Sequence, residues 1–132
     1  MYNQFLNKDN KIAIVGVSND KDKWGRKIFD KLLEADYKVV PVNPKYKQIE
    51  ESTCYSNLKE IPFIVDLVIT VVPPEISFNV IRECKQLGIE MIWMQPGSES
   101  DEALDFCEKN NLECISNACF VVDGMKTKFC YK

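Results

Sequence analysis

The sequence predicts an α/β fold, a single doubly wound domain in which helices cover both faces of a five-stranded parallel sheet. Short segments rich in β-branched residues alternate with segments of helical periodicity. Strands that alternate with single helices pair in parallel through right-handed crossovers. The segment 65–72 is almost entirely apolar, as expected for a strand that is covered on both faces. With 132 residues, the chain has the length of one domain, residues 1–132.

Five segments are predicted to form the strands, and they end in turn-forming residues. The first, KIAIVGV, contains Gly16, and the second ends at Pro44. The third ends in two prolines and the fourth in Pro96–Gly97. Numbered one to five along the chain, the strands are expected in the spatial order 3-2-1-4-5. They comprise residues 11–17, 37–44, 65–74, 90–97 and 112–116.

Three helices are predicted between these strands, in 24–36, 75–88 and 98–111. Gly88 suits the left-handed cap that ends a helix, and the third helix opens with serine and acidic residues, as a helix N-terminus should. Residues 45–64 carry no long helical stripe, so we expect a short helix and a loop there. The predicted apolar stripes are Ile28, Phe29, Leu32 and Leu33 in the first helix, and Ile76, Val80, Cys84 and Leu87 in the second.

Composition excludes several classes of function. The net charge is −3, so there is no overall basic field, and nucleic acid is not an expected partner. The sequence has no histidine, which removes Ser/His and Cys/His nucleophiles and leaves the usual zinc spacings incomplete. No apolar run is long enough to span a membrane, and the polar start MYNQFLNKDNK does not resemble a signal peptide. We therefore expect a cytoplasmic protein with no membrane association, no metal site and no catalysis of its own.

The six cysteines are expected to be reduced thiols. No CxxC pair occurs, and cytoplasmic cysteines serve mostly as small apolar side chains. Cys84 and Cys107 fall on the apolar stripes of their helices, so they are predicted to be inert core residues. The cysteines occupy positions 54, 84, 107, 114, 119 and 130.

A ligand site is predicted at the carboxyl edge of the sheet, where the strand order reverses. The strand ends there carry glycine, proline, serine or amide residues in place of ordinary charged loop residues. Each end alone reads as a structural turn, but together they indicate a shaped, uncharged cleft lined by backbone. The four ends are Gly16–Val17–Ser18, Val42–Asn43–Pro44, Val72–Pro73–Pro74 and Gln95–Pro96–Gly97.

The first of these loops suits a phosphate group. Gly16 allows close approach of the backbone, Ser18 offers a hydroxyl, and the helix that begins near Trp24 directs its positive end at the cleft. Cations follow at positions 21, 23, 26 and 27, although two aspartates partly offset them. The alternative is an ordinary solvated, charged loop.

The second strand end distinguishes between nucleotides. A site for NAD would place an acidic residue there to hold the ribose diol, and it would follow a Gly-x-Gly-x-x-Gly turn. This chain has Asn43, followed by Pro44, Lys45 and Lys47, and it lacks the glycine pattern. An acid-free end beside lysines fits a ribose that carries a phosphate, as in NADP or coenzyme A (CoA).

Taken in order, these motifs resemble the small CoA-binding protein family, whose Rossmann-like domain is similar to the N-terminal domain of the succinyl-CoA ligase alpha subunit. The most specific part is VPVNP and WMQPG in order after VGVS, and the resemblance covers nearly the whole chain. The matching segments are AIVGVSND (13–20), KWGRKIFDKLL (23–33), YKVVPVNPKY (37–46), VDLVITVVPP (65–74), MIWMQPGSESDEAL (91–104) and NNLECISNACFVVD (110–123).

The resemblance implies coenzyme A as the ligand and assigns a part of it to each strand end. The first loop would take the pyrophosphate, and the second strand end would flank the adenine and the ribose phosphate. The third end would line the cleft, and the fourth would lie beside the pantetheine path. In that order, the residues are Gly16, Val17, Ser18, Asn19, Lys23, Trp24 and Gly25; Val42, Asn43, Pro44 and Lys45; Val72, Pro73 and Pro74; and Gln95, Pro96 and Gly97.

Three functions remain open from the sequence. The first is a stand-alone module that binds CoA or an acyl-CoA without catalysis. The second is a subunit of an enzyme that uses CoA thioesters, and the third is an NAD(P)-binding redox sensor. The absence of histidine weighs against the enzyme. The missing glycine pattern, and the amide of Asn43 in place of an acid, weigh against the redox sensor.

Overall fold

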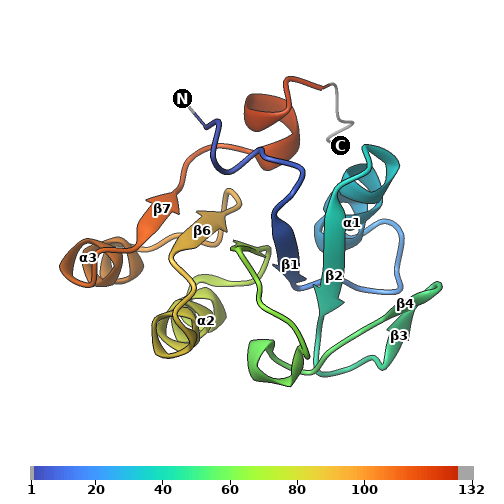
Figure 1. The fold of residues 1–132 in the computed structure, drawn as a ribbon, viewed down its shortest axis with the longest axis horizontal. Coiled ribbons are helices and arrows are strands. Elements are labelled where there is room, and N and C mark those ends of the chain that lie inside the picture. The colour runs from blue at the N-terminus through green and yellow to red at the C-terminus, as the bar shows by residue number, and fades with distance from the viewer. Residues whose placement is uncertain (1, 128–132) are drawn as a thin grey trace.

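A five-stranded parallel sheet lies at the centre of the molecule, which confirms the predicted α/β class (Figure 1). The computed structural model describes residues 2–127. The strands of the sheet are β1 (Lys11–Val15), β2 (Lys38–Val42), β5 (Leu67–Thr70), β6 (Met91–Met94) and β7 (Glu113–Ile115). They lie in the order β2-β1-β5-β6-β7, and every neighbouring pair is parallel.

The predicted strand order, 3-2-1-4-5, is wrong. Counted as five main strands, the observed order is 2-1-3-4-5, because β5 lies between β1 and β6 and not outside β2. Pro41 in β2 has no backbone N–H, so β2 is suited to the edge of the sheet. All four residues of β5 are buried, as expected for an interior strand with cover on both faces. The order therefore reverses between β1 and β5, which is where such sheets bind ligands.

Helices cover both faces of the sheet (Figure 1). One face packs against α1 (Trp24–Glu34), the N-terminal segment and a π-helical turn, η2 (Phe120–Gly124). The other face packs against α2 (Pro74–Leu87), α3 (Asp101–Lys109) and a 3₁₀ turn, η1 (Leu58–Glu60). This arrangement confirms the doubly wound architecture.

The residues of β1 show why cover is needed on both faces. Successive side chains of a strand point to opposite faces. Ile12 and Ile14 accordingly belong to the core under α1, whereas Ala13 and Val15 belong to the core under α2. A strand of consecutive apolar residues is stable only where both of its faces are removed from water.

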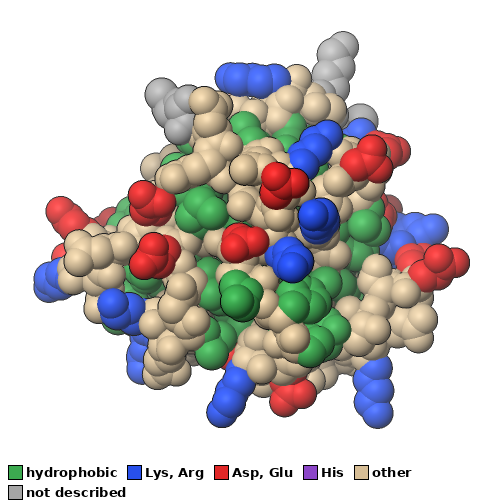
Figure 2. Space-filling model, in the orientation of Figure 1, with side chains coloured by type: hydrophobic (Ala, Val, Ile, Leu, Met, Phe, Trp, Pro, Cys, Tyr) green, Lys and Arg blue, Asp and Glu red, His purple; other side chains and the backbone are tan. Residues whose placement is uncertain are grey.

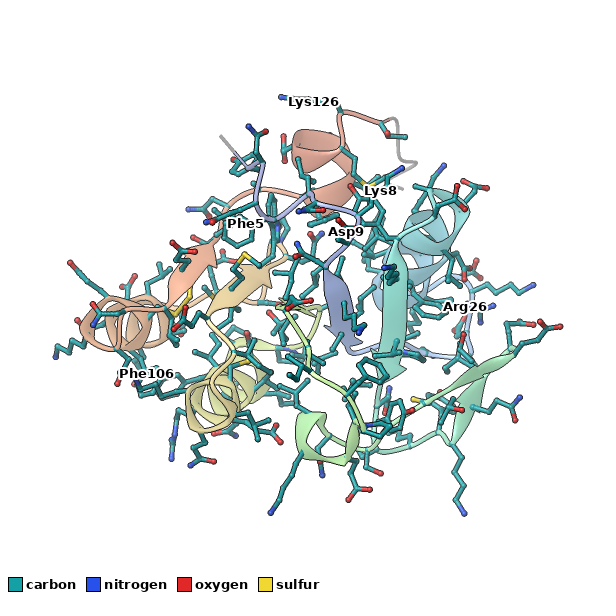
Figure 3. The ribbon with its side chains drawn as sticks, viewed as in Figure 1. Phe5, Lys8, Asp9, Arg26, Phe106 and Lys126 are labelled. Carbon is teal, nitrogen blue, oxygen red and sulfur yellow. A yellow bond between two sulfur atoms is a disulfide. The ribbon has the colours of Figure 1, made fainter. Side chains whose placement is uncertain are left out.

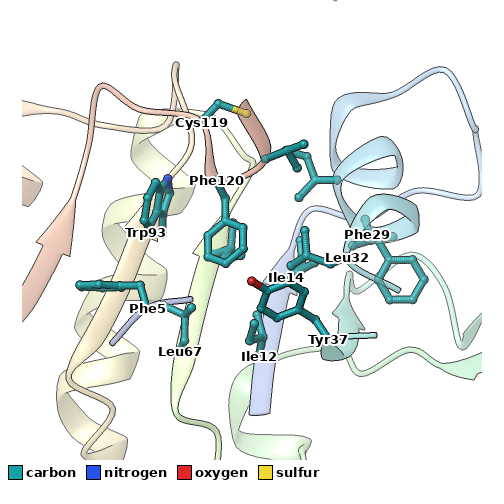
Figure 4. Close-up of a cluster of buried hydrophobic side chains, with 14 of the residues drawn as sticks. Phe5, Ile12, Ile14, Phe29, Leu32, Tyr37, Leu67, Trp93, Cys119 and Phe120 are labelled. Atoms are coloured by element: carbon teal, nitrogen blue, oxygen red, sulfur yellow. The ribbon is translucent and has the colours of Figure 1, made fainter. Parts of the chain in front are cut away.

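Trp93 belongs to the core on the α1 face, and Figure 4 shows it beside Phe120. Its side chain is fully buried, and the rings of Tyr2, Phe5 and Phe120 meet it edge-on, with centroids 4.8, 5.8 and 5.0 Å away. Its indole N–H donates to the carbonyl of Ala118 at 2.8 Å. Because a buried donor without a partner costs about 1–3 kcal/mol, this bond fixes the chain that leads into η2.

The segment 45–64 contains the predicted short helix as the 3₁₀ turn η1, but its first part folds as a hairpin where the sequence predicted a loop. The two strands, β3 (Gln48–Ile49) and β4 (Ser52–Thr53), pair antiparallel outside the main sheet. Glu50 in the turn has a φ of 53°, and Ile49 is fully buried. Strands of two residues are too short to produce an alternation that can be recognised in a sequence.

The predicted apolar stripe of α2 is correct for Cys84, which is buried, but wrong for both ends of the stripe. Ile76 and Leu87 are 48% and 43% exposed, and Leu33 in α1 is exposed as well. The buried residues of α2 are Ser77, Ile81 and Cys84. A serine can be buried here because its hydroxyl donates to Thr70 Oγ1 at 3.0 Å. Gly88 has a φ of 79° and caps the helix as predicted.

A disulfide joins Cys107 of α3 to Cys114 of β7, so the expectation of reduced thiols is wrong for this pair. The chain reverses after α3 and brings the two Cα atoms to 6.5 Å, within the range that a disulfide requires. No sequence motif marks this pairing. Cys54, Cys84 and Cys119 are unpaired and buried, and Cys130 lies outside the described residues.

The surface carries charges of both signs. On the face shown in Figure 2, Lys and Arg side chains are interspersed with Asp and Glu, so this face has no broad basic field for nucleic acid. No helix within residues 2–127 has the length and apolar character needed to cross a membrane.

Candidate ligand-binding site

A large cavity opens at the carboxyl edge of the sheet. Its volume is about 1010 Å³, at the upper end of the range typical of small-molecule sites. The ends of β1, β2, β5 and β6 and the starts of α1 and α2 contribute to it. The lining residues are Val15, Gly16, Ser18, Lys23, Trp24, Gly25, Ile28, Val42, Asn43, Pro44, Lys45, Tyr46, Val71, Val72, Pro73, Ile76, Gln95, Pro96, Gly97 and Ser98.

The structure brings the predicted site residues together around this cavity, with three exceptions. Val17 is fully buried in the core under α1. Asn19 directs its backbone carbonyl to Arg26, and Pro74 is the first residue of α2. A contact with CoA stays a prediction for each residue. Sequence reasoning missed Val15, Ile28, Tyr46, Val71, Ile76 and Ser98.

Two glycines allow the start of α1 to pack against the end of β1. Gly16 has a φ of 108°, a conformation that favours glycine, and an added Cβ would collide with the carbonyl oxygen of Val71. A Cβ on Gly25 would collide with the carbonyl oxygen of Gly16. In a dinucleotide fingerprint, the first glycine serves the tight turn and the third serves close helix–strand packing. Gly16 and Gly25 serve the same two purposes across a longer loop.

The N-terminus of α1 differs from those of α2 and α3. Its N-cap, Lys23, makes no side-chain cap, and its first turn contains no acidic residue. The first turn of α2 contains Glu75, and in α3 the N-cap Ser100 is followed by two acidic residues. Acidic residues offset the positive end of a helix dipole. Of these three helices, α1 is therefore the one that favours a bound anion at its start.

The polar and charged groups on this side of the cavity suit a phosphate. Ser18 Oγ accepts a hydrogen bond from the N–H of Asp20 at 2.9 Å and lies 3.3 Å from the hydroxyl of Tyr46. Within the described chain, the charged side chains that line the cavity are Lys23 and Lys45, and no carboxylate does so. Two cations beside a helix N-terminus whose first turn holds no acidic residue favour a bound anion.

Arg26 holds the first loop in place and is not one of the cations that face the cavity. Its side chain is buried and lies between α1 and the β3–β4 hairpin (Figure 3). It donates to Asp30 at 2.9 Å, to Glu50 at 2.7 Å and to the carbonyl of Asn19 at 3.1 Å. Burial alone would lower the pKa of the guanidinium, but the bonds to Asp30 and Glu50 outweigh it and raise the pKa. The same contact lowers the pKa of Glu50.

Asn43 joins the ends of β1 and β2. Its Nδ2 donates to the carbonyl of Val17 at 2.8 Å, and its Oδ1 accepts from the N–H of Lys45 at 2.9 Å. Its backbone N–H donates to the carbonyl of Tyr55 at 2.9 Å. The amide therefore fixes the two loops relative to each other, a structural role that the sequence did not indicate.

The opposite wall, at the ends of β5 and β6, is held by two buried residues, Gln95 and Ser98. Gln95 Oε1 accepts from the N–H of Phe120 at 2.7 Å, and its Nε2 donates to Cys119 Sγ at 3.4 Å. Ser98 Oγ lies 2.7 Å from the carbonyl of Val72 and accepts from the N–H of the same residue at 3.1 Å. The side chains of Gln95 and Ser98 are thus hydrogen-bonded within the protein.

Metal-ligating and reactive groups do not gather at the site. Across residues 2–127, no cluster of three or more potential metal ligands occurs. Burial raises the pKa of Cys54 and Cys84, which keeps these thiols protonated and poorly nucleophilic.

These features are those of the doubly wound α/β domains that bind nucleotides: a cavity where the strand order reverses, a glycine turn and an uncapped helix N-terminus. The chain belongs to the CoA binding domain family, whose sequence profile matches residues 10–125. The resemblance found in the strand-end motifs is thereby confirmed.

The relatives include ligase subunits and small proteins. Over 80 residues, the chain is 39% identical to the ADP-forming acetate–CoA ligase II subunit alpha of Pyrococcus furiosus, a match that spans 60% of this chain and 18% of that subunit. It is 26% identical over 125 residues to the uncharacterized protein YneT of Bacillus subtilis, which covers 95% of this chain and 93% of YneT. The solved structure of a conserved hypothetical protein from Pyrococcus furiosus matches with a TM-score of 0.82 and 40% identity, over 86% of this chain and 97% of that one.

Proposed function

We propose that this chain binds CoA or an acyl-CoA in the cavity and has no turnover of its own. The observation that carries the proposal is the uncapped, acid-free N-terminus of α1, which Gly25 packs against Gly16 at the wall of the cavity. Membership of the CoA binding domain family supports the identity of the ligand. The positions of α1, Lys23 and Lys45 support the orientation of CoA in the cavity that is proposed next.

The charge of the cavity wall suits a different part of CoA on each side. The pyrophosphate would bind at the first turn of α1, beside Ser18 and Lys23. The phosphate of the adenosine would lie near Lys45, after β2. The neutral pantetheine would pass Val72 and Pro73 at the end of β5. In this orientation the charged groups meet the lysines, and the uncharged chain meets the uncharged wall.

The residues that line the cavity can bind and position a ligand, but they are poorly suited to proton exchange. Catalysis at neutral pH usually needs a group whose pKa is near 7, and the sequence has no histidine. Among the described lining residues there is no carboxylate. In the proposed orientation, Lys23 and Lys45 are engaged by the phosphates of the ligand. These properties support a carrier or sensor of CoA.

Calorimetry with CoA, ADP, NADP and NAD tests the proposed ligand. We expect CoA to bind with micromolar affinity and NAD to bind most weakly, because no acidic residue follows β2 to hold its ribose diol. Lys23→Ala should weaken CoA binding about tenfold through the loss of one charge-assisted contact. Lys21→Ala removes the same charge from the same loop but outside the cavity lining, so the affinity should stay within about twofold. Tighter binding of NAD than of CoA would refute the proposal.

Incubation of the pure protein with acetyl-CoA and succinyl-CoA, with and without ATP and Mg²⁺, tests the absence of turnover. The thioesters should be lost or formed at the rate of the protein-free control. A faster rate that Lys23→Ala abolishes would mean that the chain is an enzyme.

A further inference from the structure

We infer that the preferred ligand is a CoA thioester with a small, uncharged acyl group, and that the site discriminates against acyl groups that end in a carboxylate. This inference rests on the proposed CoA site and adds the chemical class of the acyl group. It is carried by the unequal distribution of charge, apolar surface and hydrogen-bond donors between the two halves of the cavity.

The two halves of the cavity differ in charge. Lys23 and Lys45 line the half formed by α1 and the end of β2. In the half formed by β5, β6 and α2, no described lining residue is charged. Carboxylates are close to this second half: Glu75 is in the first turn of α2, and Glu99 accepts the N–H of Gly97 at 2.9 Å. Since the phosphates belong with the lysines, the acyl end of an extended ligand belongs in the second half.

The second half of the cavity has an apolar wall with a large exposed side chain. Ile76 is 48% exposed, although isoleucine is among the residue types that are most often buried. It lines the cavity together with Val71, Val72 and Pro73. An apolar acyl chain that covers this wall removes both surfaces from water. Each methylene that is fully buried in this way contributes about fourfold in affinity.

A carboxylate would find few donors in the second half. The N–H of Gly97 already donates to a carboxylate of the protein, and the Ser98 hydroxyl and the Gln95 amide are bonded to neighbouring groups. The start of α2 is a weak anion site, because Pro74 has no N–H and Glu75 offsets the dipole. A carboxylate placed there would lose hydration that few protein donors replace, which opposes binding.

Butyryl-CoA and succinyl-CoA are matched probes for this inference, because their four-carbon acyl groups differ at the end, a methyl against a carboxylate. In calorimetry with the full chain, butyryl-CoA should bind at least about fourfold tighter than CoA and at least about tenfold tighter than succinyl-CoA. If the protein binds CoA but has equal affinity for the two thioesters, the inference is overturned and the proposed CoA site is not. No binding of CoA or of either thioester would overturn the proposed function and the inference with it.

Ile76→Lys tests where the acyl group lies. A lysine there supplies a cation for the carboxylate, so succinyl-CoA should bind at least about fivefold tighter to the variant than to the wild type, and butyryl-CoA should bind more weakly. Leu87→Lys is the matched control: it adds the same charge to the same helix at a side chain that is 43% exposed and does not line the cavity. Both affinities should then stay within about twofold of the wild type. Unchanged selectivity in Ile76→Lys, with a native circular dichroism spectrum, would overturn the inference.

Discussion

Replacing Gly25 with alanine tests the packing on which the proposed phosphate site depends. The new Cβ would collide with the carbonyl oxygen of Gly16, a backbone atom that cannot rotate away, so α1 must shift from the end of β1. Overpacking of this kind costs about 1–3 kcal/mol, and the better helix propensity of alanine offsets up to about 1 kcal/mol. The expected net loss of about 1–2 kcal/mol corresponds to a fall of about 4–8 °C in Tm for a domain of this size.

The same shift should weaken CoA binding at least about tenfold, because it displaces the N–H groups that meet the phosphates. Thermal unfolding gives the stability, and calorimetry gives the affinity. Gly88→Ala is the matched control: Gly88 has a φ of 79°, and an added Cβ would have no atom within 4 Å. Alanine there costs about 1 kcal/mol in backbone strain and should leave CoA affinity within about twofold. If Gly25→Ala binds CoA as tightly as the wild type, the reasoning is refuted.

Three further substitutions test other parts of the structure. Asn43→Asp replaces the donor to the Val17 carbonyl with a negative charge near the expected ribose phosphate, so calorimetry should show about tenfold weaker CoA binding; unchanged affinity would contradict the role given to Asn43. Glu50→Gln should reduce stability, because Arg26 lowers the pKa of Glu50 in the folded protein. In urea unfolding, the difference from the wild type should be constant above about pH 5 and vanish as the pH falls through the lowered pKa; a difference that persists in acid would exclude the ion pair as its cause. Cys114→Ser should cost about 2 kcal/mol and make unfolding insensitive to reductant, and a wild type that is itself insensitive would argue against the disulfide.

The secondary structure could be predicted because its signals are local. Apolar runs, helical stripes and capping residues lie within one element, and the prediction finds the five main strands and three helices. The strand order depends on which side of β1 the chain returns to, and residues 45–64 do not encode that choice in a recognisable pattern. Pro41 is a usable signal, because a proline within a strand indicates an edge and argues against an internal second strand.

The location of the candidate site could be predicted from the strand ends, but the tasks of its side chains could not. Parallel strands end at one edge, so their turn residues must meet there. The sequence suggests that Asn43 and Gln95 contact the ligand, but the side-chain amide of Asn43 donates to Val17 and that of Gln95 accepts from Phe120. The sequence suggests that Arg26 is a cation available to the ligand, but its side chain is buried and paired with two carboxylates. Ile76 is predicted to face the core, and it lines the cavity because Ser77 takes the buried position.

The two tryptophans of this chain occupy opposite environments. Trp24 is 38% exposed at the wall of the cavity, with the ammonium of Lys27 4.7 Å from the centre of its ring. Trp93 is fully buried in the core. Because indole emission moves to shorter wavelength as water is removed from the ring, the long-wavelength part of the spectrum reports on the cavity and the short-wavelength part reports on the core. We therefore expect the emission of the unlabelled protein to distinguish a ligand that covers Trp24 from unfolding that exposes Trp93.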